Sequence, residues 1–170
     1  MKTIRETDSQ VVEWMGKWQY ELRSKQDVVG ILHLKNNQIT RAVAESAEGT
    51  WTFQKKWFPF DKVILYHGDS DAELAVLRTK LGERQSSLQF PDGHVFYWQP
   101  TNTWRNKCIF TDAFGEHLLY FHRNSNPFTI LATPKGQSNG SVEITRFGLY
   151  MYELPLLLLL GCYLMIIDSI

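Results

Sequence analysis

The chain has 170 residues, of which 44% are hydrophobic and 21% are charged, and its 18 Lys and Arg residues are balanced by 18 Asp and Glu residues. This length predicts one domain, which buries about 70% of the surface that the unfolded chain exposes. Proteins that bind nucleic acids usually carry an excess of basic residues, so the balanced charge does not support that class and we expect no nucleic-acid partner.

The first residues of the chain are polar. Met1–Gln10 contains acidic residues and no apolar stretch, so we expect neither a secretory signal nor a transit peptide. We interpret residues 1–15 as a polar leader and residues 16–170 as a single domain of a cytoplasmic protein. In that compartment we expect Cys108 and Cys162 to be reduced.

Short runs in which apolar and polar residues alternate follow, separated by turn residues. This period of two is typical of half-buried strands. The run Ala72–Lys80 also suits a helix by propensity, but strand-like neighbours favour a strand. The strands predicted in the first half are Gly16–Leu22, Val28–Leu34, Gln38–Ala44, Thr50–Lys56, Val63–Tyr66 and Ala72–Lys80.

Turn signals divide the second half in the same way. Asp92-Gly93 is typical of a tight hairpin turn, and Asp112–Gly115 predicts a second hairpin. Together with the first half, the pattern predicts about twelve strands, and Pro134–Gly140 is expected to be a polar turn. The strands predicted in the second half are Ser87–Phe90, His94–Gln99, Arg105–Thr111, His117–Arg123, Phe128–Thr133 and Val142–Gly148.

The most apolar stretch is Leu154–Ile167. The five leucines Leu156–Leu160 cover every side of a helix, because successive residues are rotated by about 100°. Such a helix must be surrounded by protein or by lipid. Its length of ~21 Å falls short of the ~30 Å of a bilayer's hydrocarbon layer, and Pro155 suits the first helical position. We therefore predict a helix over 155–167 that the protein itself encloses, with a C-terminal membrane anchor as the alternative.

Many short antiparallel strands predict a sandwich or a barrel. A closed barrel of about twelve strands has a lumen too wide for its own side chains to fill, and one apolar helix would fill it. We therefore predict a mainly β fold, an antiparallel closed barrel of about twelve strands that encloses a single C-terminal hydrophobic helix. Gly161 is expected where the barrel wall approaches the helix most closely. The expected core residues of the helix are Leu156, Leu157, Leu158, Leu160, Gly161, Tyr163, Leu164 and Ile167.

Three segments, Leu88–Trp98, Ile109–Phe121 and Leu160–Ser169, carry a family resemblance. In pattern, the chain from about Lys17 onward resembles the superfamily that joins the tubby C-terminal domain, the LURP-one-related proteins and the phospholipid scramblases. The resemblance implies a barrel wound around a C-terminal hydrophobic helix. It also implies binding of phosphoinositides through basic residues on the barrel exterior, or another association with membranes.

A calcium site of the EF-hand kind is not predicted. Asp69, Asp71 and Glu73 alternate as such ligands do, but Leu74 occupies the glycine position of that loop and Lys80 its last ligand position. We interpret the segment as a solvated turn.

A second class of small barrel shares one motif with this chain. Gly16-Lys17-Trp18 and Gly49-Thr50-Trp51 both match the Gly-x-Trp motif of lipocalin-like proteins. The alternative function is therefore a carrier of a small apolar ligand. The helix of a lipocalin, however, packs outside its barrel and has a polar face, which residues 155–167 lack.

The sequence contains no recognisable catalytic constellation. It lacks a Gly-x-Ser-x-Gly elbow, a His-Glu-x-x-His pair and a phosphate-binding glycine loop. His117 and His122 lie on opposite faces of a strand, which disfavours a shared metal ion. We therefore expect a protein that is not an enzyme, with no catalytic residues, no cofactor and no metal.

Basic residues next to tryptophans are the best candidates for a binding site. They are Lys55 and Lys56, which precede Trp57, and Arg105 and Lys107, which follow Trp104. Basic residues on a barrel exterior can hold phosphate head groups and contribute about 1 kcal/mol each near an anionic membrane. The alternative is that they are solubilising charges.

Strand alternation orients the second pair. Trp104, Cys108 and Phe110 are expected to point inward, so Arg105 and Lys107 should point outward. The function predicted from the sequence is a monomeric binding or scaffolding module, peripheral at a membrane, that recognises phospholipid head groups or a protein partner.

Overall fold

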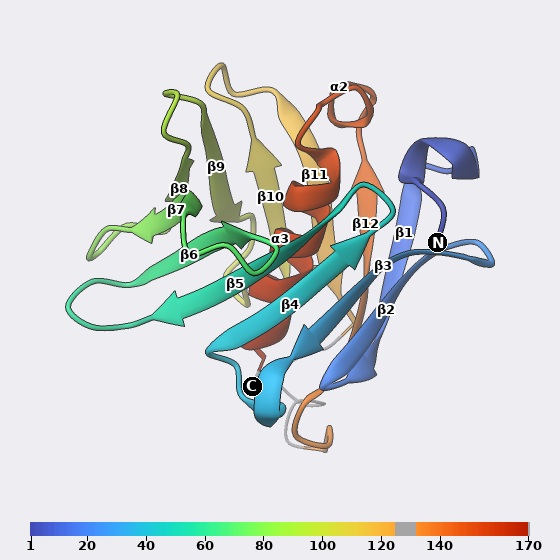
Figure 1. Cartoon of the computed structure of the whole chain (residues 1–170), viewed down its shortest axis with the longest axis horizontal. Coiled ribbons are helices and arrows are strands. Elements are labelled where there is room, and N and C mark those ends of the chain that lie inside the picture. The colour runs from blue at the N-terminus through green and yellow to red at the C-terminus, as the bar shows by residue number, and fades with distance from the viewer. Residues whose placement is uncertain (125–131, 170) are drawn as a thin grey trace.

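A computed structural model describes residues 1–124 and 132–169, and its main feature is a closed antiparallel barrel (Figure 1). Within these residues the strands pair in the order β1-β12-β11-β10-β9-β8-β7-β6-β5-β4-β3-β2, and β1 also pairs with β2. The predicted twelve-stranded antiparallel barrel is therefore confirmed. The strands are β1 (Val11–Lys17), β2 (Gln19–Ser24), β3 (Asp27–Leu34), β4 (Arg41–Ser46), β5 (Gly49–Lys56), β6 (Lys62–His67), β7 (Glu73–Thr79), β8 (Ser86–Gln89), β9 (Val95–Pro100), β10 (Lys107–Thr111), β11 (His117–Arg123) and β12 (Gln137–Ile144).

Both hairpins predicted from their turn residues are present, β8–β9 and β10–β11. Gly93 and Gly115 have positive φ angles of 96° and 84°, which glycine adopts without steric cost. Asp112 Oδ1 accepts hydrogen bonds from the backbone N–H groups of Phe114 and Glu116, at 2.8 and 2.9 Å. The ambiguous segment before residue 80 is strand β7, as predicted.

The first strand, β1, lies mostly within the segment interpreted from the sequence as a polar leader. The leader assignment is wrong over residues 11–15, because they belong to β1, in which Val12 and Trp14 alternate with exposed residues and are buried. The chain reverses at Trp18, whose φ is 65°, so the predicted continuous strand over 16–22 is divided between β1 and β2. Gly16 permits this reversal, since a Cβ there would lie 2.0 Å from the carbonyl oxygen of Gln19.

The last strand, β12, begins inside the segment expected to be a polar turn. Its buried residues include Ser138 and Gly140, which a hydrophobic pattern does not reveal. Both are small because Trp14 of β1 packs against them: Trp14 Nε1 donates to Ser138 Oγ at 3.3 Å, and a Cβ at Gly140 would lie 2.2 Å from the indole. Of the predicted strand Phe128–Thr133, residues 128–131 lie outside the described residues, and residues 132–133 are not in a strand.

Short helical segments complete the chain. Two 3-10 helices, η1 (Ile4–Thr7) and η2 (Lys35–Asn37), precede β1 and β4. The α-helix α2 (Arg146–Leu149) ends the predicted strand 142–148 early, because the hydroxyl of Thr145 caps it by accepting from the N–H of Gly148 at 3.1 Å.

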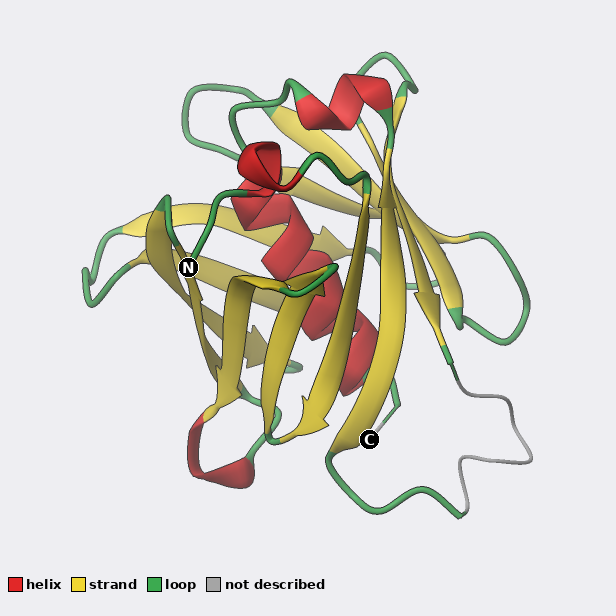
Figure 2. Cartoon of the chain, turned by 90° about the vertical axis from the view of Figure 1, so that its right-hand side faces the viewer, coloured by secondary structure: helices red, strands yellow, loops and turns green. Residues whose placement is uncertain are grey.

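The long helix α3 (Leu154–Ile167) agrees with the predicted helix to within one residue. All fourteen of its residues are buried. It contacts β3, β4, β5, β10 and β11, and Figure 2 shows strands on both sides of it. The expected close approach at Gly161 is observed, since a Cβ there would lie 2.1 Å from Cζ of Phe121. Among the described residues, no helix is long and apolar enough to cross a membrane.

Aromatic side chains line the contact between strands and helix. The Phe53 ring lies 5.6 Å from the Tyr163 ring, centroid to centroid, and the hydroxyl of Tyr163 donates to the carbonyl oxygen of Ile39 at 2.5 Å. Among β9, β10 and β11, the Trp98 ring lies 4.8 Å from the Phe110 ring and 5.1 Å from the Phe121 ring, centroid to centroid. Phe53 and Phe121 thus link strands to the helix, since Phe121 also lies against Gly161 of α3.

Candidate functional site

Three connections between strands lie at the end of the barrel where α3 terminates, which we call the Asp168 end. They are residues 57–61 (β5–β6), 80–85 (β7–β8) and 101–106 (β9–β10). The N–H of Thr79 donates to the carbonyl oxygen of Asp61 at 3.2 Å, and Arg84 donates to that of Asn102 at 2.8 Å. Arg105 Nε lies 3.7 Å from Asp168 Oδ2. These contacts link the three connections to the end of α3.

The predicted pair Lys55 and Lys56 is divided between the two faces of β5. The Lys55 side chain is only 12% exposed, forms an ion pair with Asp61, and places its ammonium 5.9 Å from the ring centroid of Trp57. Lys56 is exposed. Lys55 therefore holds the β5–β6 connection in place, whereas Lys56 is available to a ligand.

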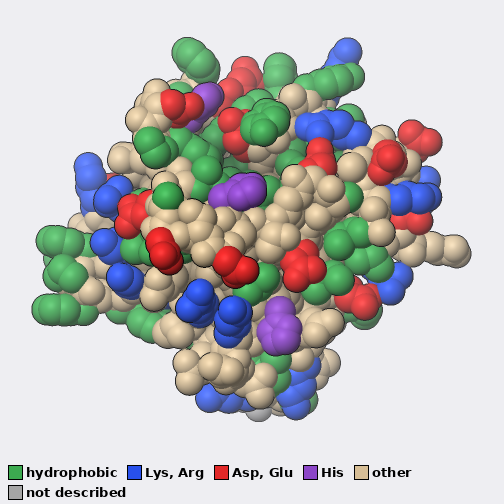
Figure 3. Space-filling view, in the orientation of Figure 1, with side chains coloured by type: hydrophobic (Ala, Val, Ile, Leu, Met, Phe, Trp, Pro, Cys, Tyr) green, Lys and Arg blue, Asp and Glu red, His purple; other side chains and the backbone are tan. Residues whose placement is uncertain are grey.

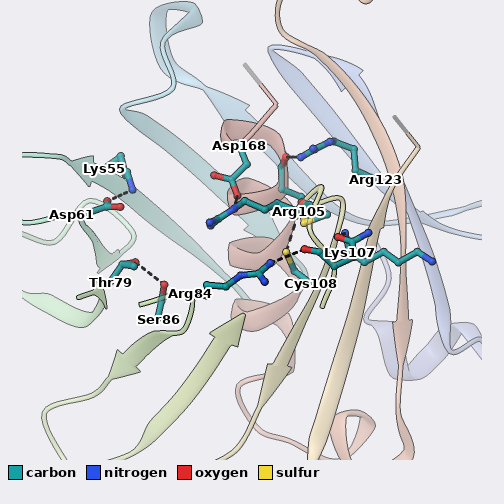
Figure 4. A network of polar contacts seen from close by, with 12 residues as sticks. Lys55, Asp61, Thr79, Arg84, Ser86, Arg105, Lys107, Cys108, Arg123 and Asp168 are labelled. Carbon is teal, nitrogen blue, oxygen red and sulfur yellow. Dashed lines mark hydrogen bonds and ion pairs between the residues drawn. The ribbon is translucent and has the colours of Figure 1, made fainter. Parts of the chain in front are cut away.

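The predicted pair Arg105 and Lys107 does not act as one site. Arg105 precedes β10 with a φ of 55°, and its side chain reaches Asp168. Figure 4 shows the Lys107 side chain pointing away from that contact. Cys108 is buried as predicted, but the inward orientation predicted for Trp104 is wrong, because its side chain is 65% exposed. Strand β10 begins only at Lys107, so its alternation does not extend back to residue 104.

A polar cluster lies at the C-terminus of α3. Arg123 of β11 is buried and donates to the carbonyl oxygen of Met165 at 2.8 Å. Burial raises the pKa of Asp168, and the positive charges of Arg105, Arg123 and Lys55 act in the opposite direction. Figure 4 shows these groups gathered at the end of the helix. Their partners lie within the protein, so we interpret the cluster as structural.

A buried thiol lies beside this cluster. Burial, followed by the negative charge of the neighbouring Asp168, raises the pKa of Cys108 to about 12. The thiolate is therefore scarce at neutral pH, which disfavours nucleophilic chemistry at this position.

An outward row of three cations crosses neighbouring strands at this end. Lys56 of β5 lies directly opposite Lys62 of β6, which lies directly opposite Arg78 of β7. We call these three residues the cationic row. Their chain neighbours Val63 and Leu77 are buried, so the row lies on the outer face of the strands, where Lys56 and Arg78 are exposed and Lys62 is half-buried. Sequence reasoning found only Lys56, because the register that aligns the three strands was needed to find the other two.

Apolar side chains project beyond the cationic row. Trp57, Phe58 and Phe60, in the β5–β6 connection, are 53%, 89% and 73% exposed, and we call Trp57–Phe60 the aromatic tip. Figure 1 shows this connection extending beyond the barrel at the left. Figure 3 shows hydrophobic side chains there, with Lys and Arg side chains beside them. Leu81 in the β7–β8 connection is also fully exposed.

In residues 1–124 and 132–169, no three His, Cys, Asp or Glu side chains come together as metal ligands would. No family model, curated protein or solved structure matches this chain. The resemblance to the tubby-like superfamily therefore stays a prediction.

Proposed function

We propose that this protein is a non-enzymatic binding module that recognises anionic phospholipids at a membrane surface through its cationic row. The observation that carries the proposal is the direct juxtaposition of Lys56, Lys62 and Arg78 on the outer face of three neighbouring strands. Within the described residues, no acidic side chain forms an ion pair with any of the three.

The arrangement carries an electrostatic cost that an anion would relieve. Like charges directly opposite each other on neighbouring strands are destabilising. Lys and Arg are the usual donors to phosphate oxygens, and Arg can bind them with two parallel hydrogen bonds. Near an anionic leaflet each cation contributes about 1 kcal/mol, so three would contribute about 3 kcal/mol, or roughly 150-fold in affinity.

The second part of the proposal concerns the barrel interior. We place α3 inside the barrel, as its filling. All fourteen helix residues are buried, and α3 contacts strands as far apart in the ring as β4 and β10, which supports this placement. A barrel filled in this way has no room for an apolar ligand. The carrier function is therefore less favoured, and ligand recognition belongs to the exterior.

Binding to vesicles tests the function. We expect the wild-type protein to sediment with phosphatidylcholine vesicles that contain phosphatidylserine or a phosphoinositide, and not with phosphatidylcholine alone. The triple variant Lys56→Gln, Lys62→Gln and Arg78→Gln should lose about 100-fold in affinity. Raising the salt concentration should weaken wild-type binding, because screening shortens the range of the attraction.

A matched control separates the site from net charge. The triple variant Lys2→Gln, Lys25→Gln and Arg146→Gln removes the same charge from exposed positions at the opposite end of the barrel. It should bind vesicles as the wild type does. The proposal would be overturned if the two triple variants lost equal affinity. It would also be overturned if the wild type bound neutral vesicles as tightly as anionic ones, or bound no vesicles at all.

A further inference from the structure

The aromatic tip is an unusual surface feature. Phe58 and Phe60 are 89% and 73% exposed, next to Trp57 at 53%. Large apolar side chains that cluster on the outside of a protein commonly mark a surface that something else covers. The burial of one Phe side chain is worth about 1.5–3 kcal/mol, so leaving two of them in water is costly unless a partner covers them.

The tip is held in position and does not fold back onto the barrel. At its base, Lys55 pairs with Asp61, and the Lys55 N–H donates to the carbonyl oxygen of Thr40 at 2.8 Å. The N–H of Thr79 donates to the carbonyl oxygen of Asp61 at 3.2 Å. Because both ends of the connection are held, the tip is presented in one place, and a shorter stretch of chain has to be ordered on binding, which favours association.

The order of chemical groups along this end of the molecule matches the layers of a bilayer. Phe58 and Phe60 are the most exposed side chains of the tip, Trp57 precedes Phe58 in the chain, and the cationic row begins at the residue before it, Lys56. From its interior to its surface, a bilayer presents acyl chains, then an interface that favours Trp, and then phosphates, so each layer meets the chemical group that suits it. Leu81, also fully exposed at this end, adds a further apolar side chain.

The size of the tip favours lipid over a protein partner. Three aromatic side chains bury about 150–250 Å² each. Together they stay below the ~800 Å² that each partner contributes to a standard protein interface. A bilayer needs no such area, because insertion of a few apolar side chains adds to the electrostatic attraction of nearby cations.

We infer that the aromatic tip inserts into the interfacial layer of an anionic bilayer while the cationic row contacts the lipid phosphates. This inference rests on the proposed function, to which it adds a hydrophobic anchor. It makes the preferred partner a lipid surface, and it predicts that a water-soluble phosphate compound binds more weakly than the same charge presented on a vesicle.

A fluorescent label reports insertion directly. Phe58→Cys carries an environment-sensitive nitrobenzoxadiazole label, and the native thiols of Cys108 and Cys162 are buried and should not react. With anionic vesicles we expect the emission to shift to the blue, and we expect brominated phosphatidylcholine to quench it. The matched control is Phe114→Cys, because Phe114 is 94% exposed at the opposite end of the barrel, and its label should show neither effect.

Side-chain replacement tests the energetic contribution. Phe58→Ser with Phe60→Ser should weaken binding to anionic vesicles by about 100-fold. It should leave binding of inositol hexakisphosphate, a water-soluble polyphosphate, unchanged. The control pair Phe114→Ser and Tyr152→Ser, at positions 94% and 91% exposed, should bind vesicles as the wild type does.

The outcomes separate the two proposals. If the wild type binds anionic vesicles but the label at position 58 stays in water and the double Ser variant binds as tightly, insertion is wrong and the cationic row stands alone. If the wild type binds no anionic vesicle, both proposals fail. If the double Ser variant also loses its affinity for inositol hexakisphosphate, the tip is needed for phosphate binding by the cationic row, and insertion is again overturned.

Discussion

The Nη1 atom of Arg123 donates a hydrogen bond of 2.8 Å to the carbonyl oxygen of Met165, so that a barrel strand binds the last turn of α3. The last carbonyl groups of a helix lack partners within the helix and carry its negative dipole end. Burial lowers the pKa of Arg123, but a guanidinium stays charged at every physiological pH. The charge of Asp168 acts in the opposite direction and favours the charged form.

Arg123→Met should therefore destabilise the protein. The variant leaves the carbonyl of Met165 without this donor and removes one of the cations near Asp168, so we expect the free energy of unfolding to fall by about 2–4 kcal/mol in urea titrations. Arg23→Met is the control, because Arg23 pairs with Glu21 at the surface and its loss should cost under about 1 kcal/mol. Similar losses in the two variants would contradict a structural role for the buried contact.

The contact between Gly161 and Phe121 gives a second prediction. A Cβ at position 161 would lie 2.1 Å from Cζ of Phe121, so Gly161→Ala should lower the free energy of unfolding by about 1–3 kcal/mol, although alanine is the better helix former. Adding Phe121→Leu provides room for the new methyl group. The double variant should then lose less than the sum of the two single losses, whereas strictly additive losses would show that this contact is not the cause.

How far the sequence predicts the fold depends on the residues involved. The leucines of 156–160 and the Asp92-Gly93 turn carry strong local signals, and both features are present in the structure. The pairing of β1 with β12 was missed because Ser138 and Gly140 are buried without being hydrophobic. Their size is explained by Trp14, which lies more than a hundred residues earlier and meets them only when the barrel closes.

The candidate site was predicted only in part for a similar reason. Lys56 was found because it adjoins Trp57 in the sequence. Lys62 and Arg78 became candidates once the register placed them beside Lys56, and local patterns do not determine register between three strands. Lys55 is a lysine like its neighbour Lys56, but its position on the inner face, where it pairs with Asp61, gives it a structural role.

Removal of β1 should disrupt the barrel. Deleting residues 1–17 exposes the paired edges of β2 and β12 and removes Trp14 from the core, so we expect loss of the cooperative urea transition and of the near-ultraviolet circular dichroism signal. Deleting residues 1–3, which precede η1, is the control and should preserve both. An unchanged transition after removal of all seventeen residues would restore the interpretation of this segment as a leader.

The last prediction concerns the pH dependence of an exposed pair near the N-terminus of α3. His94 Nδ1 lies 2.6 Å from Asp92 Oδ2, and this hydrogen bond, followed by the charge of Asp92, raises the pKa of His94. A raised pKa in the folded state means that the stabilisation is fully present below the ordinary pKa of histidine, ~6.5, and is lost as the pH rises through the folded value. The hydrogen bond from the backbone N–H of His94, followed by that from its side chain, lowers the pKa of Asp92. The stabilisation from Asp92 is therefore lost in acid, as the pH falls through this lowered pKa.

A titration of His94 followed by nuclear magnetic resonance measures this coupling directly. Asp92→Asn should lower the pKa of His94 towards its ordinary value, because the variant removes both the acceptor and the charge. Glu153→Gln should lower it less, since Glu153 Oε1 lies 4.0 Å from Nε2 of His94 and acts through its charge alone. Asp71→Asn, a change outside this pair, is the control and should leave the titration of His94 unchanged. If Asp92→Asn also left the pKa of His94 unchanged, a group other than Asp92 would have to be the cause of the raised pKa.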